Sequence, residues 1–406
     1  MKGDVYLAWA SDKPPENSIG GGVVTALLRF ALQSGWADAV LTVKRRDGNR
    51  YEGVPVVVTD PAKLEVTGGN LHCATPNLAR CLKEYAGGGF DRKVAVVCKP
   101  CDARAIIELA KRKQVNLENL LLIGLNCTGT MLPNVAKRMY IEEFGIDPAD
   151  VKMERIFPPG NKFFAVLNDG REIERDLTEL EAKGFGRREN CRRCEINIPR
   201  MADIACGKWG THGRPVSFVE ICSDKGAAFW DEAVNAGVVN TEEPGSDIIQ
   251  EREKFDQAAI QMAREWQDKL FGTYRQMDRA ARVAFWFDQF NQCIKCYGCR
   301  DACPICYCRE CRLDAGRGTV PEGEVPPGAL FGLTRAMHVA DSCVNCGQCQ
   351  DVCPANIPLS SLIGMIQQEI QAIFNYEPGV NPAQRPPLAV IEPGEVDIHS
   401  ISLAFN

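Results

Sequence analysis

Short apolar runs alternate with amphipathic segments over the first 145 residues of the chain. Three of these runs have the length of a buried strand, residues 5–10, 38–43 and 54–59. A helix with one apolar face is predicted to begin at the glycines of positions 20–22 and to end at Gly35. Residues 93–113 and 119–145 each follow the order strand, turn, helix. This alternation is typical of an α/β (α+β) fold with a mainly parallel sheet.

The rest of the chain has a different pattern. Residues 150–225 contain more strand-like segments, including a hairpin that turns at Asp169 and Gly170. Residues 247–289 are charged and helical in period, which predicts two helices. A cysteine-rich segment and a proline-rich stretch follow. We therefore divide the chain into a first domain (1–225), a helical linker (226–290), a cysteine-rich domain (291–375) and an extended tail (376–406).

The composition is that of a soluble globular protein, with 45% hydrophobic and 25% charged residues and a formal net charge of −6. An acidic balance gives no electrostatic attraction to nucleic acid, so no nucleic-acid partner is expected. No stretch approaches 18 uncharged apolar residues, so no membrane span is expected. The first residues lack a basic region followed by a long apolar core, so we expect no export signal and a cytoplasmic protein.

The chain has 20 cysteines, and their number and spacing indicate its chemistry. In a reducing compartment, so many thiols favour metal ligands or redox centres over disulfides. Most of them lie in tight groups with ligand-like spacing.

Two segments repeat the pattern Cys-x2-Cys-x2-Cys-x3-Cys-Pro. In such a pair, three close thiolates bind irons of one cubane, and the cysteine before proline binds the other cluster. One 4Fe–4S cluster would have the ligands Cys293, Cys296, Cys299 and Cys353. The second would have the ligands Cys343, Cys346, Cys349 and Cys303. Zinc also accepts four thiolates, but the repeated pattern is far more specific for a two-cluster ferredoxin-like domain.

Cysteines also follow two predicted strands of the first domain. Cys98 and Cys101 come after one strand, and Cys127 comes after the next. Because the carboxyl ends of parallel strands meet at one edge of a sheet, these thiols are expected to lie together. A further pair, Cys191 and Cys194, lies on a basic loop. With this pair, we predict a third cluster with the ligands Cys101, Cys127, Cys191 and Cys194. Cys98 and Cys206 are the substitutes if one of these is not a ligand.

Five segments of the chain occur in a characteristic order: SIGGGVVTALLRFALQSGWADAV, TGGNLHCATPN, VAVVCKPCDARAI, IGLNCTGT and CRRCEINIPRMADIACGKWGTHG. Over residues 1–225 they resemble the beta subunits of the coenzyme F420-reducing hydrogenase and formate dehydrogenase family. The appended two-cluster domain resembles the formate dehydrogenase members from methanogenic archaea. The resemblance implies a flavin-binding first domain with FAD as cofactor and coenzyme F420 as substrate. It also implies a separate alpha subunit in which a molybdenum or tungsten pterin oxidises formate.

This chain departs from the family pattern at one ligand. The hydrogenase-type members have Gly-x-Pro-Cys where this chain has Cys98-Lys99-Pro100-Cys101. The additional cysteine leaves open whether Cys98 or Cys101 is the ligand.

The flavin contacts are predicted at glycine-rich turns. A glycine turn that begins a helix offers backbone amides to a phosphate and allows a ligand to come close. With the resemblance, the predicted FAD contacts are Ser18, Gly20, Gly21, Gly22 and Thr25, with a second strip at Gly68, Gly69 and Asn70. Lys162 and the loop of residues 207–213 are further candidates for the flavin or deazaflavin pocket. His72, beside the second strip, fits a structural role better than a flavin contact.

The resemblance implies a redox role. Coenzyme F420 carries hydride, whereas cubanes carry single electrons. FAD can exchange hydride with coenzyme F420 and single electrons with the cubanes. Alternative assemblies are an F420-reducing hydrogenase or a heterodisulfide reductase complex, and the alternative from another class is a non-catalytic electron-transfer subunit.

Three further cysteines, Cys306, Cys308 and Cys311, follow the first ferredoxin-type segment. At Cys-x-Cys-x2-Cys spacing they predict part of an additional cluster whose fourth ligand is not identified. Unliganded thiols are the alternative, although free thiols beside redox centres are prone to oxidation. The predicted total is therefore three or four 4Fe–4S clusters.

Overall fold

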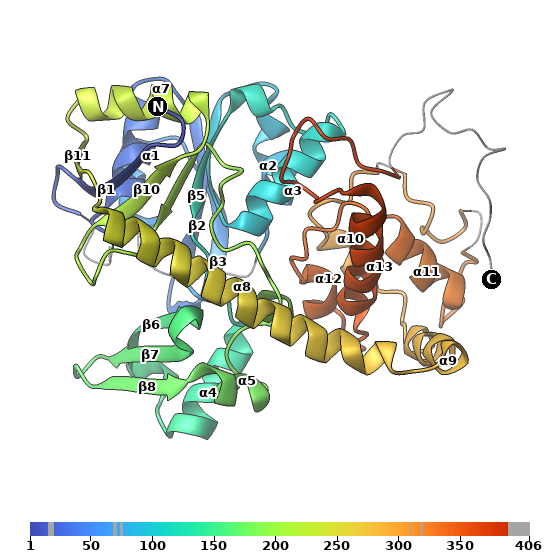
Figure 1. The fold of residues 1–406 in the computed structure, drawn as a ribbon. Coiled ribbons are helices and arrows are strands. Elements are labelled where there is room, and N and C mark those ends of the chain that lie inside the picture. Colours follow the sequence, from blue (N-terminus) through green and yellow to red (C-terminus); the bar gives the residue numbers. More distant parts are fainter. Residues whose placement is uncertain (15–19, 68–70, 74–75, 309, 318–319, 389–406) are drawn as a thin grey trace.

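The computed structural model describes residues 1–14, 20–67, 71–73, 76–308, 310–317 and 320–388 (Figure 1). Among these residues, every helix is too short or too polar to be a membrane span.

An eight-stranded sheet forms the centre of the first domain, in the order β11-β1-β10-β9-β5-β4-β2-β3. Its strands are β1 (Val5–Ala10), β2 (Ala39–Arg46), β3 (Asn49–Val58), β4 (Val94–Cys98), β5 (Leu120–Leu125), β9 (Ile204–Gly207), β10 (Ser217–Ile221) and β11 (Val239–Glu242). The neighbours β9, β5, β4 and β2 are parallel. The outer pairings are antiparallel. The predicted parallel arrangement is therefore confirmed for the centre of the sheet, and the sheet as a whole is mixed.

Helices cover both faces of this sheet. On β4, Ala95 packs in one cluster with α1 (Val23–Gln33) and α7 (Asp224–Asn235). Val94 and Val96 face the other side and pack with α2 (Leu78–Tyr85) and α3 (Pro100–Lys111). Successive side chains of a strand point to opposite faces, so a strand covered on both faces is apolar throughout.

The expected boundary at residue 225 is wrong. The helix α7 and the strand β11 belong to the first domain, because β11 pairs with β1 at the edge of its sheet. The linker helices begin only after this strand. They are α8 (Ser246–Arg275) and α9 (Arg279–Phe290), which confirms the two predicted helices. Figure 1 shows α8 running from the first domain to the cysteine-rich domain.

A small antiparallel sheet lies beside the main sheet, in the order β6-β7-β8. Its strands are β6 (Val151–Phe157), β7 (Lys162–Leu167) and β8 (Glu172–Asp176), with the helices α4 (Pro133–Phe144) and α5 (Leu177–Ala182) and, after them, α6 (Glu189–Arg192). The predicted hairpin is confirmed between β7 and β8, where Gly170 has a φ of 86°. The core of this unit includes Tyr140 and Phe163.

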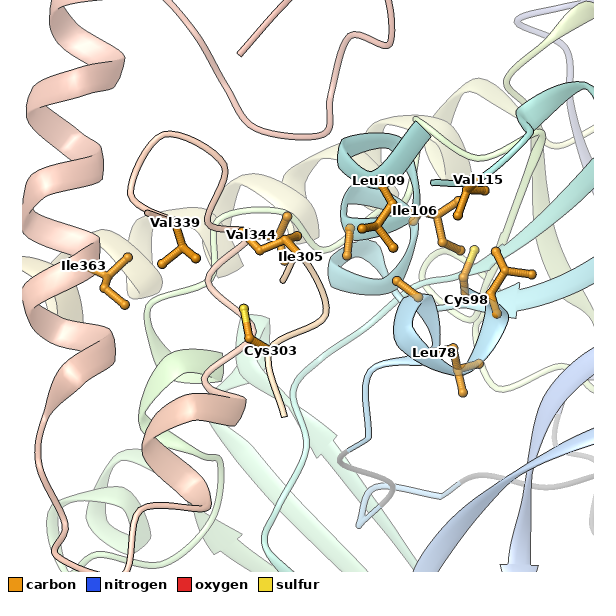
Figure 2. Packing of buried hydrophobic residues seen from close by; sticks show 14 of the residues in the cluster. Leu78, Cys98, Ile106, Leu109, Val115, Cys303, Ile305, Val339, Val344 and Ile363 are labelled. Carbon is orange, nitrogen blue, oxygen red and sulfur yellow. The ribbon is translucent and has the colours of Figure 1, made fainter. Parts of the chain in front are cut away.

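The cysteine-rich domain packs against the first domain. Its helices are α10 (Gly298–Asp301), α11 (Ala329–Met337), α12 (Gln348–Asp351) and α13 (Leu359–Phe374). One hydrophobic cluster continues from Ile106 and Leu109 of α3 to Ile305, Val344 and Ile363 (Figure 2). A shared apolar core holds the thiols of the two domains in a fixed relation.

The described part of the tail, residues 376–388, lies against this chain. Glu108 of α3 is fully buried. Its carboxylate accepts hydrogen bonds from Tyr376 Oη at 2.6 Å and from the amide of Gly379 at 2.7 Å. Lys111 Nζ and Arg112 Nη1 donate to the same carboxylate at 2.8 and 2.9 Å. Glu108 therefore anchors the tail and neutralises two cations.

The variant Glu108→Gln is expected to lower the free energy of unfolding by about 3 kcal/mol, because Lys111 and Arg112 would lose their buried counter-charge. Burial raises the pKa of Glu108, but hydrogen bonds from Lys111 and Tyr376 outweigh it, so the pKa lies below its ordinary value. The stabilisation is therefore complete above the unfolded-state pKa of about 4.3 and is lost as the pH falls through the folded-state pKa. Urea unfolding at pH 7 and at acid pH measures both effects.

The surface variant Glu84→Gln is the control, since Glu84 pairs with Arg80 on the exposed side of α2. It should change the stability by less than about 0.5 kcal/mol. Equal stability of the Glu108→Gln variant and the wild type at pH 7 would contradict the anchoring role.

Candidate functional site

A cavity of about 610 Å³ lies at the carboxyl ends of the middle strands. Val97 of β4, Leu125 of β5 and Cys206 of β9 line it. Its other walls come from the start of α1, the loop after β5, the loop of residues 207–213, the strands β6 and β7, and α8. Open sheets bind ligands at this edge, and the volume is typical of a cofactor or small-molecule site.

The glycine turn before α1 contributes to this cavity. Gly20, Gly22 and Thr25 lie on its wall. Gly21 is not part of the lining. A Cβ on Gly21 would lie 2.3 Å from the carbonyl oxygen of Pro215, and its φ is 68°, so glycine is required there by the fold itself.

Other predicted contacts are placed differently. Lys162 lies outside the cavity lining, exposed at the start of β7, and pairs with Glu174. The whole loop of residues 207–213 lines the cavity. Ser18, Gly68, Gly69 and Asn70 lie outside the described residues.

Two side chains on the cavity wall have polar atoms without partners. Both amide atoms of Asn126 are buried and form no hydrogen bond with the described residues, and the same is true of His72 Nε2. Burial lowers the pKa of His72, so its neutral form is favoured. A buried polar atom without a partner is costly. These atoms therefore indicate a ligand that would satisfy them.

Charged groups also line the cavity. Lys208 Nζ donates to the carbonyl oxygens of Arg214 and Val216 at 2.6 and 2.9 Å. Burial, together with nearby Arg155, lowers the pKa of Lys208 to about 8. In the same loop, His212 Nε2 lies 3.1 Å from a carboxylate oxygen of Glu251 of α8. The cavity thus combines cations suited to an anionic ligand with a histidine–carboxylate pair.

Four cysteines converge beside this cavity. Cys127 lies on the cavity wall after β5, and Cys101 lies in the first turn of α3. Burial raises the pKa of Cys101 well above its usual value, and the nearby Asp102, Cys127 and Cys194 contribute. Burial also raises the pKa of Cys127 to about 12, with a contribution from Cys191. The predicted third ligand set is thus brought together from three separate segments.

Of the two substitute cysteines, one lies in the hydrophobic core and the other lines the cavity. Cys98 is fully buried in the hydrophobic core, and its thiol donates to the carbonyl oxygen of Ile123 at 3.8 Å. Cys206 is buried on β9, where burial and nearby Cys222 raise its pKa to about 12. The geometry favours Cys101 over Cys98 as the ligand.

The two ferredoxin-type segments have the same backbone geometry. Lys295 and Asn345 lie at equivalent positions with φ values of 53° and 55°, and Tyr297 and Gly347 follow with 61° and 74°. The short helices α10 and α12 then begin at the same place in each repeat.

Cysteines of one ferredoxin-type segment lie beside cysteines of the other. Cys293, Cys296, Cys299 and Cys353 line one small cavity, together with Cys349 of the second predicted set. Burial raises the pKa values of Cys343, Cys346 and Cys349, and Cys303 of the other segment contributes to each.

The three predicted ligand sets have neighbouring members. Burial is the main cause that raises the pKa of Cys349, and nearby Cys299 of the first ferredoxin-type set contributes. Burial likewise raises the pKa of Cys346, with a contribution from Cys101 beside the cavity. The second ferredoxin-type set is therefore a neighbour of both other sets.

The cysteines of the additional motif have different neighbours. Cys306 hydrogen-bonds with Cys303, and this bond lowers the pKa of Cys303. Cys311 packs near Cys293, while Cys308 is exposed. The additional cluster stays a prediction, because these contacts do not bring a fourth ligand to the three thiols.

Each predicted quartet could supply one thiolate to each of the four irons of a cubane. Across the described ranges, no three His, Cys, Asp or Glu side chains surround a point where one metal ion could be held.

The fold and the site together define a class of protein. A ligand cavity at the strand ends, a group of four cysteines beside it of which Cys127 lines the wall, and an adjoining two-cluster ferredoxin-like domain are the features of an iron–sulfur oxidoreductase subunit. Residues 5–81 match the N-terminal part of the family described as "Coenzyme F420 hydrogenase/dehydrogenase, beta subunit", and residues 91–247 match the C-terminal part of the same family. Residues 289–357 match the "4Fe-4S dicluster domain" family.

Two known proteins are similar to this chain in sequence over nearly its whole length. The F420-dependent formate dehydrogenase subunit beta of Methanocaldococcus jannaschii is 43% identical over 92% of this chain and 95% of its own. The F420-dependent formate dehydrogenase 1 subunit beta of Methanococcus maripaludis is 41% identical over 96% and 98%. The chain belongs to the coenzyme F420 hydrogenase/dehydrogenase beta subunit family.

A solved structure shares the fold. A chain of the F420-reducing [NiFe] hydrogenase complex from Methanosarcina barkeri is similar with a TM-score of 0.55, at 20% identity, over 66% of this chain and 93% of that one.

Proposed function

We propose that this chain is the beta subunit of an F420-dependent formate dehydrogenase. It exchanges hydride with coenzyme F420 in the strand-end cavity and single electrons with an alpha subunit that oxidises formate at a molybdenum or tungsten pterin. The observation that carries the proposal is the identity of 43% and 41%, over more than nine-tenths of the chain, to two subunits of that name. The likeness to the hydrogenase chain supports the fold alone.

FAD is the cofactor that fits the cavity. The start of the 11-residue helix α1, with Gly20, Gly22 and Thr25, is suited to a phosphate group. Asn126 and His72 present unpartnered polar atoms on the same cavity wall. Bound FAD would supply the exchange between two-electron hydride chemistry and single electrons.

The residues of the chain would have separate tasks around this cofactor. The apolar side chains of the wall, such as Phe157, Phe164 and Trp209, exclude water. Reduction of coenzyme F420 takes up a proton together with the hydride. His212 Nε2, paired with Glu251 and half exposed, is placed to carry this proton between solvent and the cavity.

The ligand sets give the electrons a continuous route. Cys127 belongs both to the cavity wall and to the third cysteine quartet. That quartet adjoins the second ferredoxin-type set, which adjoins the first. The first set, which includes the exposed Cys296, is then the end of the route nearest to solvent and to a partner.

The test uses the full chain purified under anaerobic conditions with FAD. We expect about 12 iron atoms per chain for three clusters, or about 16 with a fourth. The chain should oxidise reduced coenzyme F420 when an artificial one-electron acceptor is present. Formate should reduce coenzyme F420 only after the alpha subunit is added.

Other outcomes separate the alternatives. A chain with clusters and flavin that cannot oxidise reduced coenzyme F420 would be an electron-transfer subunit. Copurification with hydrogenase or heterodisulfide reductase activity, without any formate oxidation, would contradict the formate assignment.

A further inference from the structure

One buried cation lies between the two ferredoxin-type cysteine sets. Arg335 of α11 is 2% exposed and lines the small cavity of the first set. Its Nη2 donates to the carbonyl oxygen of Cys299 at 2.9 Å. The guanidinium also hydrogen-bonds with Cys303, a predicted ligand of the second set. A single side chain thus touches both sets.

Arg335 has no carboxylate partner in the described part of the chain, and its Nε is buried without a hydrogen bond. Burial alone lowers the pKa of Arg335, but the nearby sulfurs of Cys303, Cys306 and Cys299 raise it above its usual value. An arginine at a comparable depth elsewhere, Arg188, pairs with Asp351. The countercharge that Arg335 lacks must therefore come from the cysteine sets.

A buried guanidinium without a countercharge is strongly unfavourable. Four thiolates around a cubane carry a net negative charge, and this charge grows by one when the cluster takes up an electron. A fixed cation nearby therefore stabilises the reduced form more than the oxidised form. Hydrogen bonds and charges in this position are known to set cluster potentials.

We propose that Arg335 is the shared countercharge of the two ferredoxin-type clusters and that it raises their reduction potentials. This proposal rests on the proposed function for the presence of the clusters. Each reduction is a one-electron uptake from an external reductant, in which no bond forms or breaks. Arg335 thus acts on electron transfer only through the two clusters whose potentials it raises.

The experiment is a reductive titration of the cluster-loaded full chain, followed by electron paramagnetic resonance. The variant Arg335→Gln keeps a donor for the Cys299 carbonyl but removes the charge. We expect the reduction equilibrium of the ferredoxin-type clusters to become at least about tenfold less favourable, which is about 59 mV for one electron. The variant Arg335→Lys keeps the charge and should retain the wild-type potentials.

The control is Arg317→Gln, which makes the same charge change in the same domain. Arg317 is 45% exposed and pairs with Glu310, so its loss should leave the potentials unchanged.

The outcomes divide as follows. An Arg335→Gln variant with wild-type iron content and unchanged potentials would overturn the proposal. If the Arg335→Gln variant loses iron, the Arg335→Lys variant decides. Retained iron with wild-type potentials supports the countercharge. Loss of iron from Arg335→Lys, or a fall of its potentials by about 59 mV, overturns it. A wild-type chain with normal clusters that cannot oxidise reduced coenzyme F420 would contradict the proposed function and leave the role of Arg335 standing. A wild-type chain that binds no iron would overturn both.

Discussion

Replacing Cys101 by alanine is expected to remove about four of the iron atoms of the chain and to abolish F420-linked electron transfer. Cys101 lies near Cys127 and Cys194, within the only quartet that adjoins the cavity among the described residues. Electron transfer falls steeply with distance, so a gap between the cavity and the second ferredoxin-type set stops it. Iron analysis and the oxidation of reduced coenzyme F420 measure the two effects.

The ferredoxin-type clusters should survive this change. Their eight cysteines come from other segments, so their paramagnetic signals should persist when a chemical reductant is added. F420-linked activity should fall to background, although the flavin remains bound.

The variant Cys98→Ala is the matched control, three residues away. Cys98 packs in the hydrophobic core and hydrogen-bonds with Ile123, so its loss should leave a small cavity at a cost of about 1–2 kcal/mol and all of the iron. The reverse result, in which Cys98→Ala loses iron and Cys101→Ala does not, would exchange the two cysteines as ligands.

The parts of the fold with local signals could be predicted from the sequence. The middle strands β4 and β5 are buried on both faces, so they occur in the sequence as continuous apolar runs. The ferredoxin-type segments repeat one spacing, and the structure gives them one backbone geometry. In these places the local pattern alone determines the structure.

The domain boundary could not be predicted in this way. The strand β11 has four residues, Val239–Glu242, and only its first residue is buried. It is a strand because it pairs with β1, which lies more than 200 residues earlier in the chain. The antiparallel edges of the sheet depend on the same long-range pairing, for which a short mixed sequence carries no signal.

The candidate site was predicted only in part for a related reason. Gly20, Gly22 and Thr25, which line the cavity, could be singled out because a glycine turn before a helix has a local meaning. Glu251 was missed, since it is one of many charged residues on α8 until the fold places it beside His212. Asn126 had a signal that could have been used, because a polar residue directly after a buried strand lies at the ligand edge of the sheet.

Replacing Asn126 by leucine is expected to have opposite effects on ligand binding and on stability. Both amide atoms of Asn126 are buried on the cavity wall without a partner in the described structure. In the proposed complex FAD would satisfy them, so leucine should weaken FAD binding about tenfold or more, which is roughly 1.4 kcal/mol. Without FAD, the same change removes an unsatisfied polar group and should stabilise the chain by about 1 kcal/mol.

Two measurements on the cluster-loaded chain test this pair of effects: flavin fluorescence titration for affinity, and urea unfolding of the flavin-free form for stability. The control Asn197→Leu removes a buried asparagine whose amide donates to Asp256 at 3.2 Å. That variant should lose about 1–3 kcal/mol of stability and keep its FAD affinity. An unchanged FAD affinity in the Asn126→Leu variant would show that the flavin does not contact this wall, whereas a loss of both affinity and stability would mean that Asn126 bonds to another part of the protein in the flavin-free form.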